Sequence, residues 1–396
     1  MTERASHADP AARARDDAGP APDALALHRR AILVDMHADT VQRVVDEGAN
    51  INARLADGHL DAVRAREGGL DAQFFSIWVE PEHFGAGGAA AVERADLQIA
   101  AVRALAAERP DVWQQAGSAA DIRRIAAEGK IATLMGLEGG YAIDGRIENV
   151  EKYFRLGVRY LSPAWTVSLP WAGSSGDDEG AARGLDGFGR EVIGEMNRLG
   201  MMPDVSHVSD KTFWDMIGAS TKPVIASHSN ARALVNVPRN LTDDQIRALA
   251  AMGGVCSVVF YPRFVEAGWQ DAQRRVDAEI AEAADEAERS ATGTPSQKRR
   301  ARERVRAAAF ASRLPPVHAA RVVDHVDHIA RLVGVEHIGV GSDFDGINAT
   351  PADLSSVADF PNLTIELLRR GYAEADVEKI LGGNILRVME QTHSGP

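Results

Sequence analysis

The chain has 396 residues, of which 45% are hydrophobic and 26% are charged, and its formal net charge is −13 at neutral pH. These proportions are typical of a soluble globular protein, and the acidic charge argues against nucleic acid or an anionic membrane as a partner. The single cysteine, Cys256, excludes an intrachain disulfide and a metal site made of thiolates alone.

The N-terminal residues 1–23 are rich in Ala, Asp, Arg and Pro and contain no apolar run. This composition predicts a disordered tail and not a signal peptide. No stretch reaches the roughly 18 consecutive apolar residues that a membrane span needs. Together with the single cysteine, these features predict a cytoplasmic protein in which residues 24–396 form one domain.

From residue 31 onward, segments with the pattern of buried strands alternate with helical segments. The expected strands are Ala31–Met36, Asp71–Val79, Ile131–Leu137, Gly157–Ser162, Met202–Ser206, Pro223–Ser227, Gly254–Phe260 and His337–Gly341. Helices are expected between them, for example at Ala90–Glu108, Ile147–Leu156, Gly187–Leu199, Asp243–Met252 and Ala319–Val333. Eight strands separated by helices predict a (β/α)8 barrel of the TIM type.

A doubly wound open sheet is the alternative arrangement of alternating strands and helices. Such a sheet typically has a glycine-rich phosphate loop after its first strand. Here residues 37–40, His-Ala-Asp-Thr, stand in that place. A barrel also explains why polar residues follow the strands, because barrel active sites lie at the C-terminal ends of the strands.

Residues 266–313 interrupt the alternation, since they are rich in Ala, Glu and Arg and contain no strand pattern. Val276 and Ile280 fall on one helical face, and Thr294 and Pro295 supply the N-cap and first turn of a second, basic helix. The segment predicts a helical hairpin inserted after the seventh strand. It is expected to be either a lid or oligomer contact on the active-site side, or a solvated decoration.

Four predicted strands end in side chains that bind divalent metals: His37 with Asp39, Glu138, His207 and His228. Two metals need roughly five or six protein ligands, of which one bridges. A carboxylate can bridge two ions, so Glu138 is the predicted bridge, with His37 and Asp39 on one ion and His207 and His228 on the other. A water shared by ions about 3.5 Å apart would be acidified toward hydroxide.

Asp343 directly follows the last strand and is expected to point into the same mouth. A carboxylate beside the hydroxide can accept its proton and deliver it to a leaving amine. Asp345, two residues later, is predicted to be structural. The Ser-His pairs at 206–207 and 227–228 do not indicate a serine hydrolase, because the chain has no Gly-x-Ser-x-Gly elbow.

These residues resemble the membrane dipeptidase family, also called renal dipeptidase, among the amidohydrolase-like metal barrels. The resemblance extends from about Ala31 to Glu390 and leaves out the tail and the hairpin. It rests on the motifs at 35–39 (DMHAD), 137–140 (LEGG), 157–161 (GVRYL), 204–209 (DVSHVS), 227–231 (SHSNA), 341–346 (GSDFDG) and 382–388 (GGNILRV). It implies a zinc dipeptidase with two Zn²⁺ ions per chain, bridged by Glu138 and a hydroxide, and activity on dipeptides that includes L-Xaa-D-Xaa.

The same resemblance implies substrate contacts. Arg239 matches an arginine that binds the free carboxylate of the dipeptide, Tyr261 matches a tyrosine that lines the pocket, and Asp343 also receives the free amine. Trp165 is a departure, because the mammalian pattern has a histidine there that helps to bind the substrate and polarise its carbonyl. Since tryptophan cannot be a cation, oxyanion stabilisation is expected to rest more on the metal.

Two other functions stay open. The first is a different metal-dependent amidohydrolase that acts on a lactone, a cyclic amide or a deamination substrate. Arg239 favours a carboxylate-bearing substrate, whereas Trp165 favours divergence from the dipeptide specificity of the family. The second is a metal-stabilised binding or scaffold protein with the hairpin as its interface, against which the intact ligand set argues. Barrels of this kind are often dimers, so a homodimer is one expected assembly.

Overall fold

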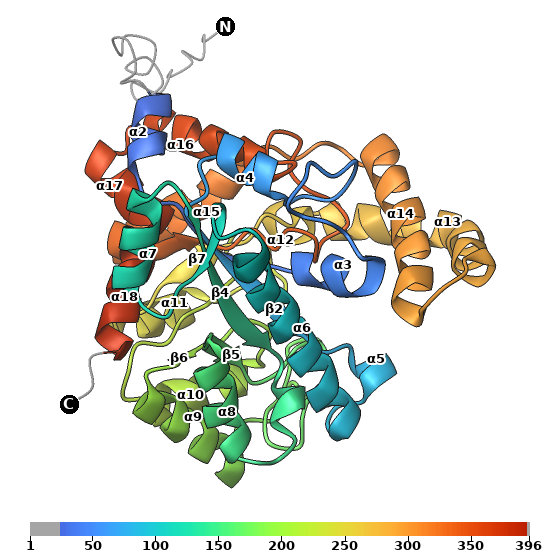
Figure 1. Cartoon of the computed structure of the whole chain (residues 1–396), viewed down its shortest axis with the longest axis horizontal. Coiled ribbons are helices and arrows are strands. Elements are labelled where there is room, and N and C mark those ends of the chain that lie inside the picture. Colours follow the sequence, from blue (N-terminus) through green and yellow to red (C-terminus); the bar gives the residue numbers. More distant parts are fainter. Residues whose placement is uncertain (1–23, 394–396) are drawn as a thin grey trace, which may run out of the picture.

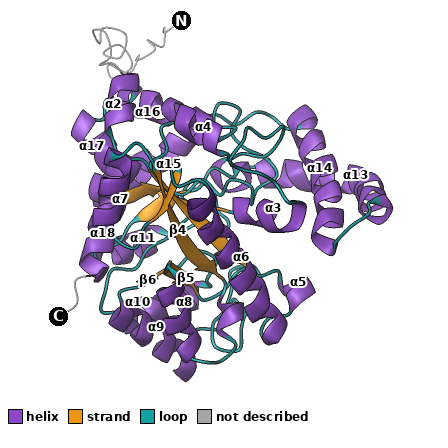
Figure 2. Cartoon of the chain, in the orientation of Figure 1, coloured by secondary structure: helices purple, strands orange, loops and turns teal. Residues whose placement is uncertain are grey.

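The computed structural model describes residues 24–393, in which helices surround a central barrel of parallel strands (Figure 1, Figure 2). The tail predicted at residues 1–23 lies outside the described residues. The strands are β1 (Val34–Ala38), β2 (Ala72–Trp78), β3 (Trp113–Gln115), β4 (Ile131–Glu138), β5 (Val158–Ser162), β6 (Met202–Pro203), β7 (Cys256–Val258) and β8 (Ile338–Val340).

The order along the barrel is β6-β5-β4-β2-β1-β8-β7, and the neighbouring strands are parallel. Residues 225–226 close the gap between β6 and β7, because Ile225 forms a parallel bridge with Asp204 and Ala226 forms one with Cys256. The predicted TIM-type (β/α)8 barrel is therefore confirmed, and its C-terminal rim carries the ends of all these strands.

Several predicted strands are shorter than expected, and β7 covers only Cys256–Val258 of the predicted Gly254–Phe260. Residues 202–206 contribute only the two residues of β6, and residues 223–227 form isolated bridges in place of a strand. The cause is the side chain of Asp204, whose Oδ1 accepts the backbone N–H groups of Ser206 (3.0 Å) and Ser227 (2.8 Å). These two amides bond to a carboxylate, so they are not available for strand pairing.

One strand, β3, was not predicted. Its three residues show no alternation of apolar and polar side chains, so no sequence pattern marks it. It pairs with the first half of β4, through residues 131–133, and β5 pairs with the second half, through residues 135–138. β4 thus runs the full depth of the barrel and ends at Glu138 on the rim.

Helices cover the outside of the barrel and fill its connections (Figure 1). The α-helices are α2 (Ala24–Arg30), α3 (Thr40–Glu47), α4 (Ala62–Glu67), α5 (Pro81–Phe84), α6 (Ala89–Glu108), α7 (Ala119–Ala127), α8 (Glu148–Leu156), α9 (Gly187–Leu199), α10 (Asp210–Ala219), α11 (Asp243–Ala251), α12 (Pro262–Val265), α13 (Trp269–Ser290), α14 (Pro295–Arg313), α15 (Ala319–Val333), α16 (Phe360–Arg369), α17 (Glu374–Glu378) and α18 (Asn384–His393). Shorter turns are η1 (Gly140–Ile143), η2 (Val335–His337), η3 (Val357–Asp359) and the π-turn η4 (Lys379–Gly383).

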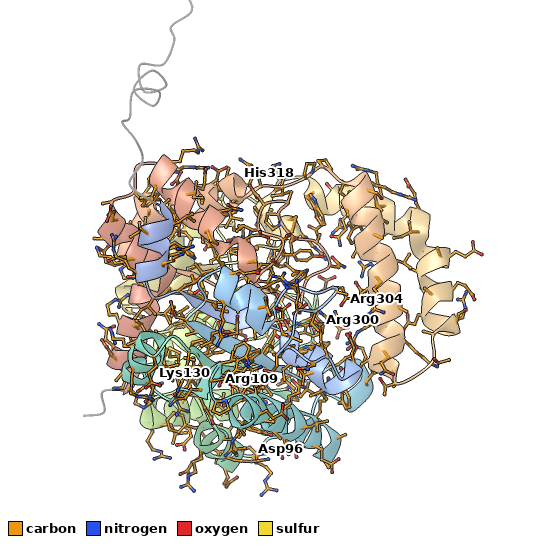
Figure 3. The ribbon with its side chains drawn as sticks, turned by 45° about the horizontal axis from the view of Figure 1, so that its top comes forward. Asp96, Arg109, Lys130, Arg300, Arg304 and His318 are labelled. Carbon is orange, nitrogen blue, oxygen red and sulfur yellow. The ribbon has the colours of Figure 1, made fainter. Side chains whose placement is uncertain are left out.

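The helical pair predicted at residues 266–313 is present as α13 and α14, which stand to one side of the barrel (Figure 1). The arginines of α14 face carboxylates. Arg306 pairs with Asp277 of α13 (2.9 Å), whereas Arg300 pairs with Glu47 of α3 (2.5 Å) and Arg304 with Asp57 (3.3 Å). Figure 3 shows Arg300 and Arg304 on α14. The basic charge of this helix is therefore matched within the chain.

The hairpin also contacts the rim of the barrel. Asn348, in the loop after β8, donates from Nδ2 to Glu303 of α14 (2.9 Å) and accepts a hydrogen bond from the Tyr261 hydroxyl (3.0 Å). The same hydroxyl accepts a hydrogen bond from Gln273 of α13 (3.1 Å). These contacts place the hairpin on the active-site side of the barrel, as one wall of the mouth.

Candidate metal centre and active site

Four of the five predicted metal ligands gather around the fifth, Glu138, at the rim. His207 Nε2 lies 2.9 Å from Glu138 Oε1, and His228 Nε2 lies 3.5 Å from the same oxygen. His37 Nε2 lies 3.3 Å from Glu138 Oε2 and 3.5 Å from Asp39 Oδ2. The ligand atoms thus form two groups that could each hold a cation, and Glu138 belongs to both.

The chemistry of this donor set fits a borderline divalent cation such as zinc. His37 Nε2 is buried and has no hydrogen-bond partner among the described residues. The Nε2 atoms of His207 and His228 lie only 3.0 Å apart. Buried nitrogens are normally paired, so three imidazole nitrogens directed at two carboxylates are best explained as ligands of a cation.

The protonation states of His207, His228 and Glu138 also fit metal binding. Burial lowers the pKa of His207 to about 4 and lowers that of His228 well below its usual value, and nearby positive charge adds to both shifts. Both rings are therefore neutral at pH 7, which is the form that binds metal. Burial alone would raise the pKa of Glu138, but the surrounding histidines hold it well below its usual range. Glu138 is thus ionised.

Buried hydroxyl groups fix the orientation of two of the rings. His37 Nδ1 lies 2.7 Å from the hydroxyl of Tyr160, and His228 Nδ1 lies 2.7 Å from Ser227 Oγ. The Ser227 hydroxyl donates to Asp204 Oδ2 (2.6 Å), so it accepts its other hydrogen bond from His228 Nδ1–H. This tautomer leaves the lone pair of His228 Nε2 free for a metal.

Two fully buried carboxylates hold the loops that carry the ligands. Asp204 joins the turns before His207 and His228, as described above for the barrel. On the other side, Asp35 accepts hydrogen bonds from the backbone N–H (2.8 Å) and hydroxyl (2.7 Å) of Ser342. Burial raises the pKa of Asp35 to about 6. Each of these carboxylates connects two strand ends that are distant in the sequence.

Sequence reasoning assigned no role to Asp35, Asp204, Tyr160 or Ser76, although all four support ligands. The Ser76 hydroxyl donates to Glu138 Oε2 (2.7 Å). Their positions could have identified the two aspartates, because Asp35 and Asp204 lie two and three residues before a predicted histidine ligand. Buried aspartates at such sites commonly fix ligand geometry.

Backbone strain is concentrated at the same rim. His207 (φ 72°), Asp343 (φ 65°) and Asp345 (φ 65°) adopt the left-handed region, which non-glycine residues rarely occupy. Such strain persists at functional sites when the surrounding contacts enforce it. Asp345 accepts hydrogen bonds from the Thr40 hydroxyl (2.5 Å) and the His59 N–H (3.0 Å), which supports its predicted structural role.

Asp343 lies at the cluster, since its carboxylate groups with His37 and His228. Burial and the charges of Asp39 and Glu138 raise the pKa of Asp343 well above its usual value. Arg239 donates from Nη1 to Ser229 Oγ (2.7 Å). Its Nε and Nη2 atoms are buried and have no hydrogen-bond partner among the described residues, so they can receive a carboxylate.

The other two predicted substrate contacts, Trp165 and Tyr261, lie in different surroundings. The Trp165 ring lies 6.2 Å from that of His207 and is therefore at the mouth. The Tyr261 hydroxyl is occupied by Asn348 and Gln273, where it joins the hairpin to the loop after β8. Trp165 thus borders the metal cluster directly, and the role predicted for Tyr261 stays a prediction.

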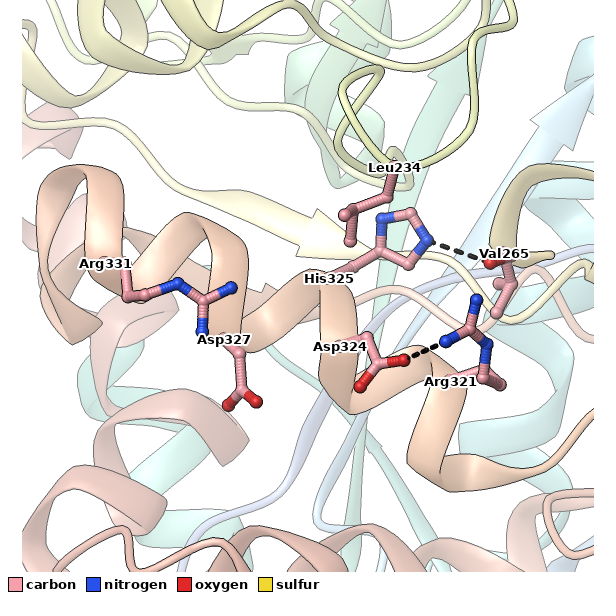
Figure 4. A pocket seen from close by; sticks show the side chains of 7 residues that line it. All are labelled: Leu234, Val265, Arg321, Asp324, His325, Asp327 and Arg331. Carbon is pink, nitrogen blue, oxygen red and sulfur yellow. Dashed lines mark hydrogen bonds and ion pairs between the residues drawn. The ribbon is translucent and has the colours of Figure 1, made fainter. Parts of the chain in front are cut away.

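A second hollow lies away from this cluster, between α15 and the loop after residue 231 (Figure 4). Arg321 pairs with Asp324 (2.5 Å), and both Asp324 and Asp327 pair with Arg370 (2.6 Å each). His325 accepts a hydrogen bond from Ala231 N–H (3.1 Å) and donates to the carbonyl of Val265 (3.1 Å). His325 therefore supports the loop that follows His228, and the hollow has a structural role.

The whole described fold matches one protein family. The model of the membrane dipeptidase family (peptidase family M19) matches residues 22–395. The chain belongs to the membrane dipeptidase family. It is accordingly a hydrolytic enzyme of the metallopeptidase class with a metal cofactor, and its substrates are small peptides.

Individual relatives agree with this membership. The chain is 32% identical over 338 residues to dipeptidase aclJ of Aspergillus oryzae, and the match covers 84% of this chain and 69% of the relative. It is 31% identical over 339 residues to dipeptidase tcpJ of Claviceps purpurea, with the same coverage of 84% and 69%. The probable dipeptidase PvdM of Pseudomonas aeruginosa has the same fold, with a TM-score of 0.78 and 27% identity over 93% of this chain and 97% of that one.

Among residues 24–393, no helix combines the length and the apolar character that crossing a bilayer requires.

Proposed function

We propose that this enzyme is a binuclear zinc dipeptidase in which Glu138 bridges the two ions. The observation that carries the proposal is the position of Glu138, whose two oxygens each face a separate group of ligands, with His37 and Asp39 on one side and His207 and His228 on the other. When bound, two zinc ions would supply a bridging hydroxide for attack on the amide and would polarise the scissile carbonyl.

The residues of the chain then bind the two ends of the dipeptide. The unpaired Nε and Nη2 donors of Arg239 suit the C-terminal carboxylate, because a guanidinium group offers two parallel hydrogen bonds to it. The carboxylate of Asp343 suits the free amine at the other end. Recognition of both charged ends would restrict the enzyme to dipeptides, since a longer chain would move one charge out of reach.

Asp343 also carries the proton. Its carboxylate takes up a proton during attack on the amide and delivers it to the leaving nitrogen. Burial and the neighbouring Asp39 and Glu138 raise the pKa of Asp343, which makes its carboxylate a more basic acceptor for that proton. Trp165 carries no charge and offers one N–H at most, so its contribution is to pack against the substrate.

A second candidate is another amidohydrolase reaction at the same site, on a lactone, a cyclic amide or a deamination substrate. Trp165 is the observation that favours it, because an indole stands where the mammalian pattern has a histidine. Arg239 and Asp343 favour the dipeptide, since a substrate that lacks one terminal charge would leave one of them unpaired in a buried site.

The test is hydrolysis of a panel of L-Xaa-L-Xaa and L-Xaa-D-Xaa dipeptides by the zinc-loaded protein. We expect cleavage of free dipeptides and none of their N-acetylated or C-amidated forms. Asp343→Asn, at matched zinc content, should lower kcat by about 10²- to 10⁴-fold. A zinc-loaded wild type that cleaves no member of the panel would contradict the dipeptidase proposal and favour the second candidate.

Two further predictions concern the whole molecule. The cytoplasmic location and the homodimer both stay predictions. Sedimentation of the purified protein measures the oligomeric state, and fractionation of the producing cells measures the location.

A further inference from the structure

Trp78 and Trp165 form an aromatic wall beside the metal ligands. Trp78 is the last residue of β2 and pairs in register with Glu138. Side chains alternate along a strand, so Trp78 lies on the same face as Ser76, which donates to Glu138 Oε2. Trp78 therefore lies next to Glu138 at the C-terminal end of β2, at the mouth of the barrel.

The two indoles contact each other and the cluster. Their ring centroids are 4.8 Å apart at an angle of 63°, an edge-to-face arrangement. Trp165 in turn lies 6.2 Å from His207, centroid to centroid. Both tryptophans are only partly buried, so part of their surface stays accessible to solvent.

The backbone of Trp78 is held rigidly. The side chain of Gln98, on α6, accepts the Trp78 N–H (3.0 Å) and donates to the Trp78 carbonyl (2.6 Å). Gln42 of α3 donates to the same Gln98 oxygen (2.9 Å). A residue whose backbone is fixed in this way loses little further backbone freedom when a ligand packs against its ring.

The helical hairpin supplies the third member of the wall. The Arg299 guanidinium of α14 lies 5.3 Å from the centre of the Trp78 ring, and it pairs with the buried Glu80 just after β2. A cation over an indole face is attractive. The hairpin thereby contacts the aromatic wall through Arg299.

We propose that Trp78, Trp165 and Arg299 form the specificity pocket of this enzyme, and that it selects dipeptides carrying a bulky aromatic or apolar side chain. The inference rests on the proposed dipeptidase function. Arg239 and Asp343 bind the two charged ends of any dipeptide and so do not distinguish one side chain from another. The open indole surface is the neighbouring element that can do so, because aromatic contacts favour large apolar groups.

The experiment compares kcat/KM for Ala-Ala, Phe-Ala and Ala-Phe. We expect the zinc-loaded wild type to prefer one of the phenylalanine dipeptides over Ala-Ala by about 10-fold or more. Trp78→Ala and Trp165→Ala should each remove most of this preference, and Trp78→Phe should keep part of it. Arg299→Ala should reduce it by only about 2- to 5-fold.

Matched controls separate the wall from general effects. Trp214 is an exposed tryptophan on α10, and Arg313 pairs with Glu279 within the hairpin. Trp214→Ala and Arg313→Ala should leave both the preference and the rate unchanged. Thermal unfolding identifies any variant that fails to fold, and Trp78→Phe, which keeps an aromatic ring, then stands in for Trp78→Ala.

The outcomes distinguish the two proposals. If the wild type hydrolyses no dipeptide, the dipeptidase proposal fails, and the specificity pocket fails with it. If the wild type hydrolyses all three equally, or if Trp78→Ala, Trp78→Phe and Trp165→Ala lower all three rates by the same factor, only the specificity pocket is overturned.

Discussion

The two halves of the cluster around Glu138 differ in their residue types and in the strands that carry them. On the β1 side, His37 and Asp39 lie at the end of a strand of five residues, close to the carboxylate of Asp343. On the other side, His207 and His228 lie in turns that follow much shorter strand pairing. The first half is rich in carboxylate oxygen and the second in imidazole nitrogen.

The electrostatics of the halves differ in the same way. Burial opposes protonation of His37, yet Tyr160 and Glu138 raise the pKa of His37 well above its usual value. The pKa of His207 instead falls to about 4. The carboxylate-rich half therefore attracts positive charge, whereas the imidazole-rich half offers neutral nitrogens, and Glu138 is the group that the two share.

The two halves also differ in the contacts that hold their ligands in place. On the β1 side, strand pairing, the Tyr160 hydroxyl and the carboxylate of Asp35 together place His37. Where pairing ends early, Asp204 takes over, because its carboxylate receives both the backbone amides and the Ser227 hydroxyl. Both halves thus use a buried carboxylate, and the imidazole-rich half depends on it more because its strand pairing is shorter.

The largest effect is expected from removing the shared group. Glu138→Gln replaces a bridging carboxylate with an amide that cannot bind two cations, so the zinc content should fall from about two ions per chain to less than one. Elemental analysis after dialysis measures this. Glu47→Gln, at the hairpin contact with Arg300, is the matched control and should keep its zinc. Retention of two ions by Glu138→Gln would show that the halves are independent sites.

The next effect concerns His325, which supports the imidazole-rich half through Ala231. Burial lowers the pKa of His325 from 6.5 to about 4 in the folded protein. The unfolded chain therefore binds the extra proton first as the pH falls. The stability that comes from neutral His325 is fully present above pH 6.5 and is lost as the pH drops toward 4, by about 3 kcal/mol.

Urea unfolding of the metal-free protein between pH 7 and 4 measures this loss. His325→Gln should be less stable at pH 7, and its stability should decline less steeply with falling pH than that of the wild type. An equal decline in both proteins would assign the pH dependence to other groups.

A smaller effect is expected from the support of His228. Asp204→Asn should weaken zinc binding by about 10- to 100-fold, and in the imidazole-rich half only. Ser227→Ala, which removes only the hydroxyl link to His228, should have the same direction and a smaller size. Competition with a chromophoric chelator resolves one weakened site from one unchanged site. Equal weakening of both sites would show that Asp204 maintains the whole barrel.

The sequence predicted the barrel and the ligand cluster because both leave local patterns. His37, Glu138 and Asp343 each follow an apolar run, and the ends of such runs meet at one rim. β6 and residues 223–227 were predicted too long, since the Asp204 side chain competes with the ladder across 23 residues of sequence. The contact of Arg299 with Trp78 was equally unpredictable, because its partners are 221 residues apart and no periodicity connects them.

The most direct test of the central claim is a zinc-loaded crystal examined by anomalous scattering at the zinc edge. We predict two zinc peaks, one bounded by His37 and Asp39 and the other by His207 and His228, with Glu138 between them. A single peak, or two peaks of which neither contacts Glu138, would contradict the account.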